Sequence, residues 1–202
     1  MKSNSKVLAL KYRPQTFNQL VGQSVVAESI FNSIKSNKIP NAYMLLGIRG
    51  SGKTSTARIV AKALNCENGV ENLCTNNFCE SCKSIIAGNN IDILEIDAAS
   101  KTSVDDVREL IEFSRYPPSL AKFKIFIIDE VHMLSKQAFN ALLKTLEEPP
   151  KYLKFIFATT EVKKIPITVI SRCQRYDLSR IKSEELFNYL KNITIKEKKE
   201  VE

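Results

Sequence analysis

Long apolar runs are missing from this 202-residue sequence, and none approaches the roughly 20 residues that a helix needs to cross a bilayer. The basic N-terminus is not followed by an apolar stretch as long as that of a secretory signal. Histidine is represented once, by His132, to which we assign packing or hydrogen bonding and no metal or catalytic role. These absences argue against a membrane or secreted protein, and we expect a cytoplasmic one.

The overall composition is that of a soluble globular protein, with 44% hydrophobic and 26% charged residues. The length suits one substantial domain and part of another. A net charge of +8 suits a polyanionic partner, with a solvated basic surface as the alternative. Five cysteines in an intracellular chain favour metal binding or free thiols over disulfides.

The most specific motif begins at Gly47 and reads Gly-Ile-Arg-Gly-Ser-Gly-Lys-Thr, a full match to the phosphate-binding pattern G-x-x-x-x-G-K-[ST]. Glycines let the backbone N–H groups surround a phosphate at a helix N-terminus. Lys53 is expected to reach the terminal phosphates and Thr54 to bind Mg²⁺. The predicted nucleotide-binding residues of this loop are Gly47, Gly50, Ser51, Gly52, Lys53, Thr54 and Ser55.

Strands and helices are predicted to alternate around this loop, which favours an α/β fold with a parallel sheet. A lead-in at 7–22 is expected to be extended. The predicted strands cover 42–46, 91–97, 123–128, 153–160 and 173–178, and the predicted helices cover 23–37, 53–64, 104–115, 135–148 and a segment from 183 onward.

Two acids, Asp129 and Glu130, follow the apolar strand at 123–128, at the end where ligands bind in parallel sheets. Beside a phosphate loop, Asp129 is placed to hold Mg²⁺ and Glu130 to orient or deprotonate a water for attack on the γ-phosphate. Thr159 and Thr160 end the next strand, where ordinary strand threonines are the alternative.

Four cysteines lie in an insert at 66–82, namely Cys66, Cys74, Cys79 and Cys82. Cys79 and Cys82 form a C-x-x-C knuckle, and four thiolates would fill a tetrahedral structural zinc site. The insert has few apolar residues, so a metal would be what orders it. Reduced, unliganded cysteines or a redox pair are the alternative.

Several longer strings closely resemble the gamma/tau family of bacterial DNA polymerase III subunits, the ATPase motors of sliding-clamp loaders in the AAA+ superfamily. They are Leu-Lys-Tyr-Arg-Pro-Gln-Thr-Phe from Leu10, Asp-Glu-Val-His-Met-Leu-Ser from Asp129, Asn-Ala-Leu-Leu-Lys-Thr-Leu-Glu-Glu-Pro-Pro from Asn140, and Ser-Arg-Cys from Ser171. The resemblance covers about residues 7 to 190.

This resemblance implies a P-loop NTPase (AAA+) fold with a five-stranded parallel sheet over 1–178, followed at 179–202 by the beginning of a truncated helical lid. It implies a Mg²⁺-dependent ATPase that acts in a pentameric ring with other clamp-loader subunits, opens the sliding clamp and loads it onto primer-template DNA. The residues that match family positions are Arg13, Pro14, Val21 and Gly22 for the nucleotide base, Thr160 as the sensor, Arg172 as a finger toward the neighbouring subunit, and Lys101 and Arg108 toward DNA.

Some of these assignments have alternatives. Read without the resemblance, Arg172 is an ordinary solvated or salt-bridged arginine, and Lys101 and Arg108 are solvated basic residues. Four residues separate Cys74 from Cys79, where the family usually has two, which places Cys74 in doubt as a ligand. Alternative functions are a branch-migration or helicase-type motor of the same superfamily and a scaffold that does not hydrolyse nucleotide. The intact Lys53 and Glu130 oppose the scaffold.

Overall fold

The computed structural model describes residues 7–100 and 103–197. Its centre is a five-stranded sheet in the order β2-β3-β4-β1-β5, in which all neighbours run parallel. The strands are β1 (Ala42–Leu46), β2 (Ile93–Asp97), β3 (Lys124–Asp129), β4 (Leu153–Thr159) and β5 (Gln174–Asp177). All five lie within about two residues of the predicted ranges, which confirms the expected parallel sheet. Lys101, a predicted DNA contact, lies outside the described residues.

The three central strands, β1, β3 and β4, carry near-continuous apolar sequence because both faces of the sheet are covered. Alternate side chains point to opposite faces. Met44, Phe126 and Phe155 belong to the core on one face, and Tyr43 and Ile127 belong to the core on the other. Two apolar cores therefore sandwich one sheet.

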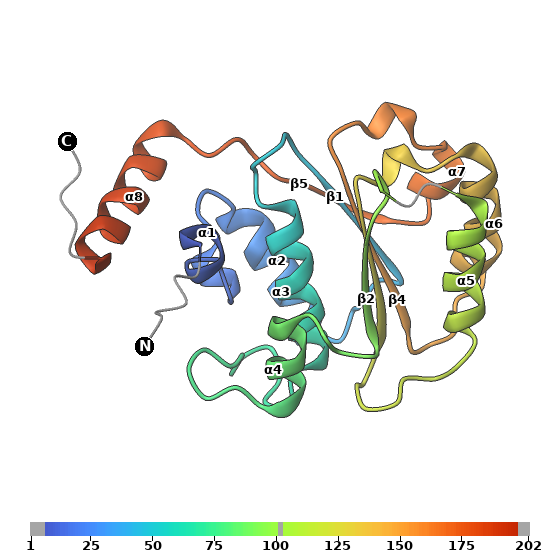
Figure 1. Cartoon of the computed structure of the whole chain (residues 1–202), viewed down its shortest axis with the longest axis horizontal. Coiled ribbons are helices and arrows are strands. Elements are labelled where there is room, and N and C mark those ends of the chain that lie inside the picture. The colour runs from blue at the N-terminus through green and yellow to red at the C-terminus, as the bar shows by residue number, and fades with distance from the viewer. Residues whose placement is uncertain (1–6, 101–102, 198–202) are drawn as a thin grey trace.

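Helices cover both faces (Figure 1). One side carries α2 (Ser24–Lys35), α3 (Lys53–Asn65) and α4 (Glu80–Ala87), and the other carries α5 (Val104–Ser114), α6 (Lys136–Glu147) and α7 (Ile167–Ile170). Ser135 is the N-cap of α6, since its hydroxyl accepts a hydrogen bond from the backbone N–H of Ala138 at 3.2 Å. Ser103 and Asp106 form a capping box at the start of α5.

The lead-in differs from the expected extended segment. It contains a short helix, α1 (Leu8–Lys11), and a single 3₁₀ turn, η1 (Phe17–Gln19). The turn forms because Phe17 and Leu20 are buried in the same core as α2 and α3. Two further 3₁₀ turns, η2 (Val131–Met133) and η3 (Val162–Lys164), follow β3 and β4.

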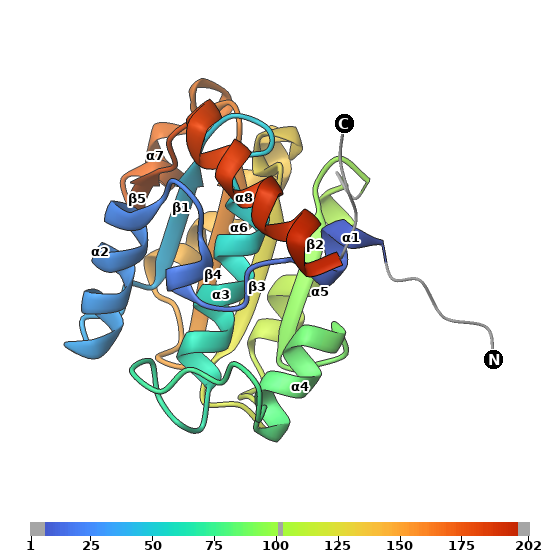
Figure 2. The same cartoon turned by 90° about the vertical axis from the view of Figure 1, so that its left-hand side faces the viewer.

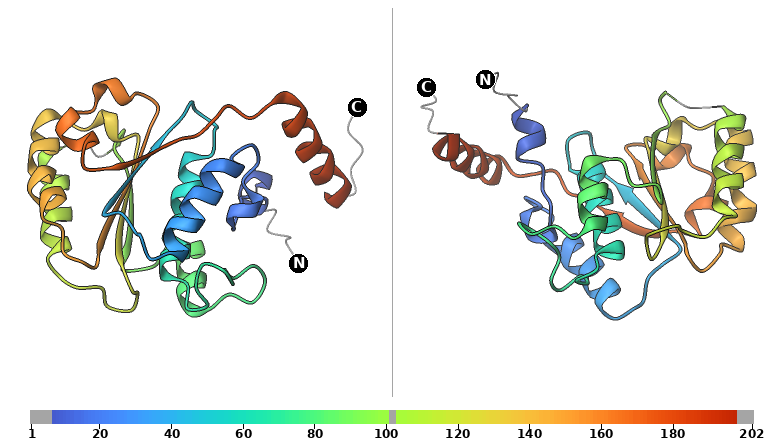
Figure 3. Two further views of the ribbon diagram at one scale, coloured as in Figure 1. Left: turned by 180° about the vertical axis from the view of Figure 1, so that it is seen from behind. Right: turned by 60° about the horizontal axis from the view of Figure 1, so that its bottom comes forward.

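The last described helix, α8 (Ser183–Glu197), lies apart from the sheet and beside α1 (Figures 2 and 3). The Tyr189 hydroxyl donates to the carbonyl of Tyr12 at 2.9 Å, and the Tyr12 hydroxyl donates to Glu197 at 2.5 Å. The last described helix thus holds the start of the lead-in. Among the described helices, none has the length and apolar character of a bilayer crossing.

Candidate nucleotide and metal sites

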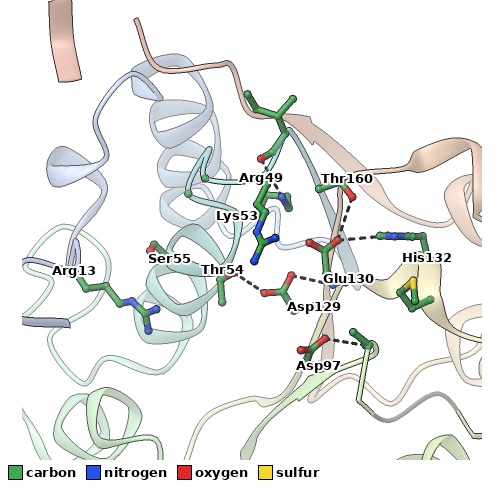
Figure 4. A pocket seen from close by; sticks show the side chains of 15 residues that line it. Arg13, Arg49, Lys53, Thr54, Ser55, Asp97, Asp129, Glu130, His132 and Thr160 are labelled. Atoms are coloured by element: carbon green, nitrogen blue, oxygen red, sulfur yellow. Dashed lines mark hydrogen bonds and ion pairs between the residues drawn. The ribbon is translucent and has the colours of Figure 1, made fainter. Parts of the chain in front are cut away.

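A cavity of about 940 Å³ opens at the carboxyl ends of the strands (Figure 4). Strand register brings this about, because Leu46 pairs with Thr159 and Asp97 with Asp129, so the segments that follow these strands meet at one edge. The cavity is lined by Arg13, Ile48, Arg49, Gly50, Gly52, Lys53, Thr54, Ser55, Asp97, Ala99, Asp129, Glu130, His132, Met133 and Thr160. Nine of the predicted site residues therefore line this cavity.

The glycine loop has the conformation that its sequence predicts. Gly50 and Gly52 have φ of +82° and +96°, values that favour glycine, and Gly52 is the N-cap of α3. A Cβ on Gly47 would lie 2.5 Å from the Ser51 hydroxyl, so a side chain does not fit there. The Lys53 ammonium donates to the carbonyls of Gly47 and Ile48 at 3.0 and 3.1 Å. The loop carbonyls therefore hold the buried lysine against the loop itself.

Asp129, the last residue of β3, faces the start of α3. The Thr54 hydroxyl donates to Asp129 Oδ2 at 2.5 Å, and Asp129 Oδ1 accepts the backbone N–H of Glu130 at 2.9 Å (Figure 4). A hydroxyl and a carboxylate that converge in this way are oxygen donors of the type that Mg²⁺ takes. The two residues predicted to hold magnesium are therefore adjacent, although they are far apart in sequence.

Glu130 is held from two sides. The Thr160 hydroxyl donates to its Oε2 at 3.3 Å, and His132 Nδ1 lies 3.4 Å from the same oxygen. His132 Nδ1 also lies 2.9 Å from the Thr159 hydroxyl, which agrees with the hydrogen-bonding role assigned to this histidine. Glu130 has a left-handed backbone, with φ 46° and ψ 44°, which is uncommon for a residue other than glycine or asparagine.

Several predicted residues lie outside the cavity lining: Pro14, Val21, Gly22, Gly47, Ser51 and Arg172. Gly22 (φ +70°) lies against α8 and the segment before it, since a Cβ there would meet Glu185 at 2.9 Å and Ile181 at 3.5 Å. Arg13 does line the cavity. The pKa of its guanidinium is lowered mainly by burial and to a smaller extent by the positive charge of Arg58.

Arg172 follows α7. Its guanidinium donates to the Thr168 carbonyl at 2.6 Å and to Glu147 at 2.7 Å. It therefore does not contribute to this chain's own cavity. Arg108, the other predicted DNA residue, is exposed on α5 and pairs with Asp105 at 3.0 Å.

Three residues that sequence reasoning did not assign also belong to this region. Arg49 and Asp97 line the cavity. Gln23 is buried, with its amide donating to the carbonyls of Ser179 at 2.7 Å and Ser51 at 3.2 Å, so it ties the phosphate loop to the chain after β5. The position of Asp97 at a strand end, like that of Asp129, is a signal that would have identified it.

The four cysteines of the insert meet in one cluster, with their sulfur atoms all within 4.8 Å of one another. Cys66 and Cys74 Sγ are 3.6 Å apart, so Cys74, in doubt from its spacing, is brought in with the others. Tetrahedral zinc at its usual Zn–S distance places sulfurs about 3.8 Å apart. The donor set and spacing therefore fit such an ion.

The cysteines also form the insert's own core, packed with Leu73 and Phe78. The backbone N–H of Cys79 lowers the pKa of the Cys74 thiol to about 7, whereas burial raises the pKa of Cys66 and Cys82. Because bound metal requires thiolates, the cluster would release protons when it is filled.

A family model described as DNA polymerase III, delta subunit, matches residues 22–182. The DNA polymerase III subunit gamma of Buchnera aphidicola subsp. Schizaphis graminum is 49% identical over 94% of this chain and 52% of its own length. The subunit tau of Escherichia coli is 47% identical over 93% of this chain and 29% of its own. The chain thus spans about half of the gamma relative and under a third of the tau relative.

Solved structures confirm the fold. A DNA polymerase III gamma subunit-related protein of Thermotoga maritima superposes with a TM-score of 0.55 at 23% identity, covering 84% of this chain and 49% of its own. The RuvB Holliday junction branch migration motor of the same organism gives 0.66 at 19% identity, covering 95% and 56%. These similarities support the P-loop NTPase (AAA+) fold and nothing beyond it.

The family model covers most of the chain, and the gamma and tau relatives extend over nearly all of it. The chain belongs to the family described as DNA polymerase III, delta subunit, and it corresponds to the N-terminal part of the bacterial gamma/tau subunits.

Proposed function

We propose that this chain is the ATP-binding and ATP-hydrolysing part of a DNA polymerase III clamp-loader subunit. The observation that carries the proposal is the meeting of Thr54 and Asp129 at 2.5 Å beside the phosphate loop, with Glu130 next in the chain. A loop that binds phosphate, an oxygen pair for Mg²⁺ and a carboxylate for a water are the parts that nucleoside triphosphate hydrolysis needs. The relatives are named as gamma and tau subunits of DNA polymerase III, which points to DNA replication, and the choice of ATP rests on the resemblance to the gamma/tau family.

Each part has a role in this proposal. The backbone N–H groups of the loop, with Lys53, bind the phosphates, and Thr54 and Asp129 hold the metal. Magnesium, when bound, neutralises charge on the phosphate oxygens. Glu130 accepts a proton from the attacking water, and Thr160 orients the Glu130 carboxylate through its 3.3 Å hydrogen bond.

Arg172 serves a different subunit in this proposal. Its guanidinium lies outside the cavity, while Glu147 at 2.7 Å fixes its direction. A rigid cationic fork of this kind stabilises charge on a transferred phosphoryl group and is worth about 10³–10⁵ in rate. We therefore assign it to the ATP site of the adjacent subunit in a pentameric ring of clamp-loader subunits.

The remaining assignments are part of the same proposal. Residues 1–178 form the ATPase domain, and residues 179–202 are the beginning of a helical lid. The nucleotide base is contacted by Arg13, Pro14, Val21 and Gly22. Zinc fills the four-cysteine cluster of 66–82. Exposed Arg108 contacts the backbone of primer-template DNA without reading its sequence, as clamp loading at any primer end requires. Lys101 is assigned the same role. The ring opens the sliding clamp and releases it on DNA after hydrolysis.

The test measures zinc content and ATP hydrolysis on one preparation of the full-length subunit, with and without partner subunits and primed DNA. Lys53→Ala is expected to abolish nucleotide binding. Glu130→Gln is expected to keep binding and to lower turnover by about 10²–10⁴-fold. Glu161→Gln is the matched control, because Glu161 is near Glu130 through His132 but pairs with Lys164 at 2.9 Å. Wild-type turnover no higher than that of Glu130→Gln in every condition would favour a scaffold instead.

A further inference from the structure

Lys62, in the phosphate-loop helix α3, has an almost fully enclosed side chain, with 1% of its surface exposed. Its ammonium donates to the carbonyl of Gln15 at 3.0 Å and to the carbonyl of Cys74 at 2.6 Å. It also lies 4.8 Å from the centre of the Phe78 ring. A buried ammonium is costly without such partners, so the position of Lys62 depends on all three.

The partners of Lys62 belong to two segments that are separate in sequence. Gln15 is in the lead-in, which passes across α3 (Figure 2), and Cys74 and Phe78 are in the cysteine insert. α3 itself begins at Lys53 and Thr54. One side chain therefore joins the phosphate-loop helix, the lead-in and the metal cluster.

The lead-in connects this contact to the large cavity. A second cavity, of about 40 Å³, is lined by Arg13, Pro14, Gln15 and Lys62 among others. Arg13 lines both cavities, and the Gln15 side chain donates to the Arg13 carbonyl at 3.2 Å. A shift of the Gln15 backbone would consequently move Arg13 at the wall of the nucleotide site.

We propose that Lys62 is a positioning residue that couples metal occupancy of the cysteine cluster to nucleotide affinity. The proposal rests on the proposed function, because it assumes that the large cavity binds a nucleotide and that Arg13 and Pro14 face its base.

The coupling follows from the contacts. A dication held by four thiolates fixes the backbone of Cys74 and leaves an excess of negative charge, which favours an ammonium beside it. Lys62 then holds the Gln15 carbonyl, and with it the Arg13 and Pro14 segment. Without metal, the insert keeps only a small core, the Cys74 carbonyl is no longer fixed, and the lead-in loses one of its attachments.

The coupling must be reciprocal, because linkage requires that nucleotide raise metal affinity by the factor by which metal raises nucleotide affinity. It must also distinguish ligands. ATP carries a base, whereas tripolyphosphate engages only the phosphate loop. Metal removal should therefore weaken ATP binding and leave tripolyphosphate binding unchanged.

The experiment uses the full-length subunit as wild type, Lys62→Met and the control Lys83→Met. Lys83 lies in α4 of the cysteine insert, but it is exposed, and its ammonium pairs with Glu80 at 2.6 Å. Dissociation constants for ATP and for tripolyphosphate are measured by calorimetry on zinc-loaded and on chelator-treated protein. Wild type and Lys83→Met are expected to lose about tenfold in ATP affinity on metal removal. Lys62→Met should bind ATP with the same reduced affinity in both states.

The reciprocal measurement competes a chelator for zinc with and without ATP. Zinc should be held about tenfold more tightly with ATP in wild type, and equally with and without it in Lys62→Met. Lys62→Arg, which keeps a charge and donors, should restore part of the coupling. A residue needed only for stability would lower the unfolding temperature without removing this linkage.

The outcomes separate the two proposals. If wild type binds neither ATP nor tripolyphosphate, the proposed function fails. If wild type binds both and neither affinity depends on zinc, the coupling is refuted whether or not Lys62→Met folds. A Lys62→Met protein that keeps the wild-type zinc dependence, or an equal loss for tripolyphosphate, would also overturn the inference.

Discussion

Replacing Glu130 by glycine and, separately, by alanine measures the strain stored at the proposed catalytic position. Both variants lose the same side-chain contacts, so their difference isolates the backbone. At φ 46° and ψ 44°, an L side chain costs about 1–2 kcal/mol. Glycine avoids this cost but loses about 0.5–1 kcal/mol more conformational entropy than alanine on folding. We expect Glu130→Gly to be more stable than Glu130→Ala by about 1 kcal/mol.

The assay is urea unfolding followed by circular dichroism, with the slope of the transition checked to be equal in both variants. The expected difference corresponds to about 2–4 °C in the thermal midpoint for a chain of this size. Glu161 provides the matched pair, since it is close by but has φ of −131°, where alanine should be the more stable replacement by about 0.5–1 kcal/mol.

The result that refutes this reasoning is alanine equal to or more stable than glycine at position 130. Both Glu130 variants are expected to bind nucleotide and to lack turnover. A more stable but inactive glycine variant would show that the left-handed backbone orients the Glu130 carboxylate at a cost in stability. Thr160 and His132 contact this carboxylate.

Two further predictions concern Asp92 and Cys74. Asp92 is buried and accepts the backbone N–H groups of Ser119, Leu120 and Ala121 at 2.8–2.9 Å. Burial alone would raise the pKa of Asp92, but these donors outweigh it and hold the pKa below its ordinary value. Asp92→Asn should cost about 3 kcal/mol at pH 7 in urea unfolding, and exposed Asp105→Asn under about 0.5 kcal/mol. The pKa of Asp92 is lower in the folded than in the unfolded protein. The stability that Asp92 contributes is therefore complete above the unfolded-state pKa of about 3.9 and is lost as pH falls through the folded-state pKa. A stability difference between wild type and Asp92→Asn that is the same at pH 3 as at pH 7 would contradict this. Cys74→Ser should weaken zinc binding in chelator competition by at least about tenfold, whereas Cys173→Ser, outside the cluster, should leave it unchanged. Wild-type zinc affinity in Cys74→Ser would remove Cys74 from the ligand set.

The sheet and the phosphate loop could be predicted from sequence because local signals determine them. Mostly apolar stretches predicted β1, β3 and β4, which are five to seven residues long. Gly50 and Gly52 were recognisable because few other residues take their backbone angles. Asp129 was found because it ends a buried strand.

The rest depends on contacts between distant segments. α4 was not predicted, since its Cys79 to Ala87 stretch indicated a metal knuckle more strongly than a helix. No sequence pattern marks Lys62 on α3 as a buried residue, and it is buried because the lead-in and the insert cover it. The left-handed backbone of Glu130 has no local sequence signal at all. Whether Arg172 and Arg108 act as proposed is still a prediction.

The strand order also has a consequence for how the protein is made. β1, which leads into the phosphate loop, pairs on one side with β4 and on the other with β5, and both are synthesised long after it. At ribosomal speeds of about 5–20 residues per second, an apolar strand waits for several seconds with both edges unpaired. The phosphate loop of the nucleotide site is thus synthesised early, but the strands that hold it in place are synthesised late. Until β4 emerges, the nascent chain must be kept from pairing with other exposed strands.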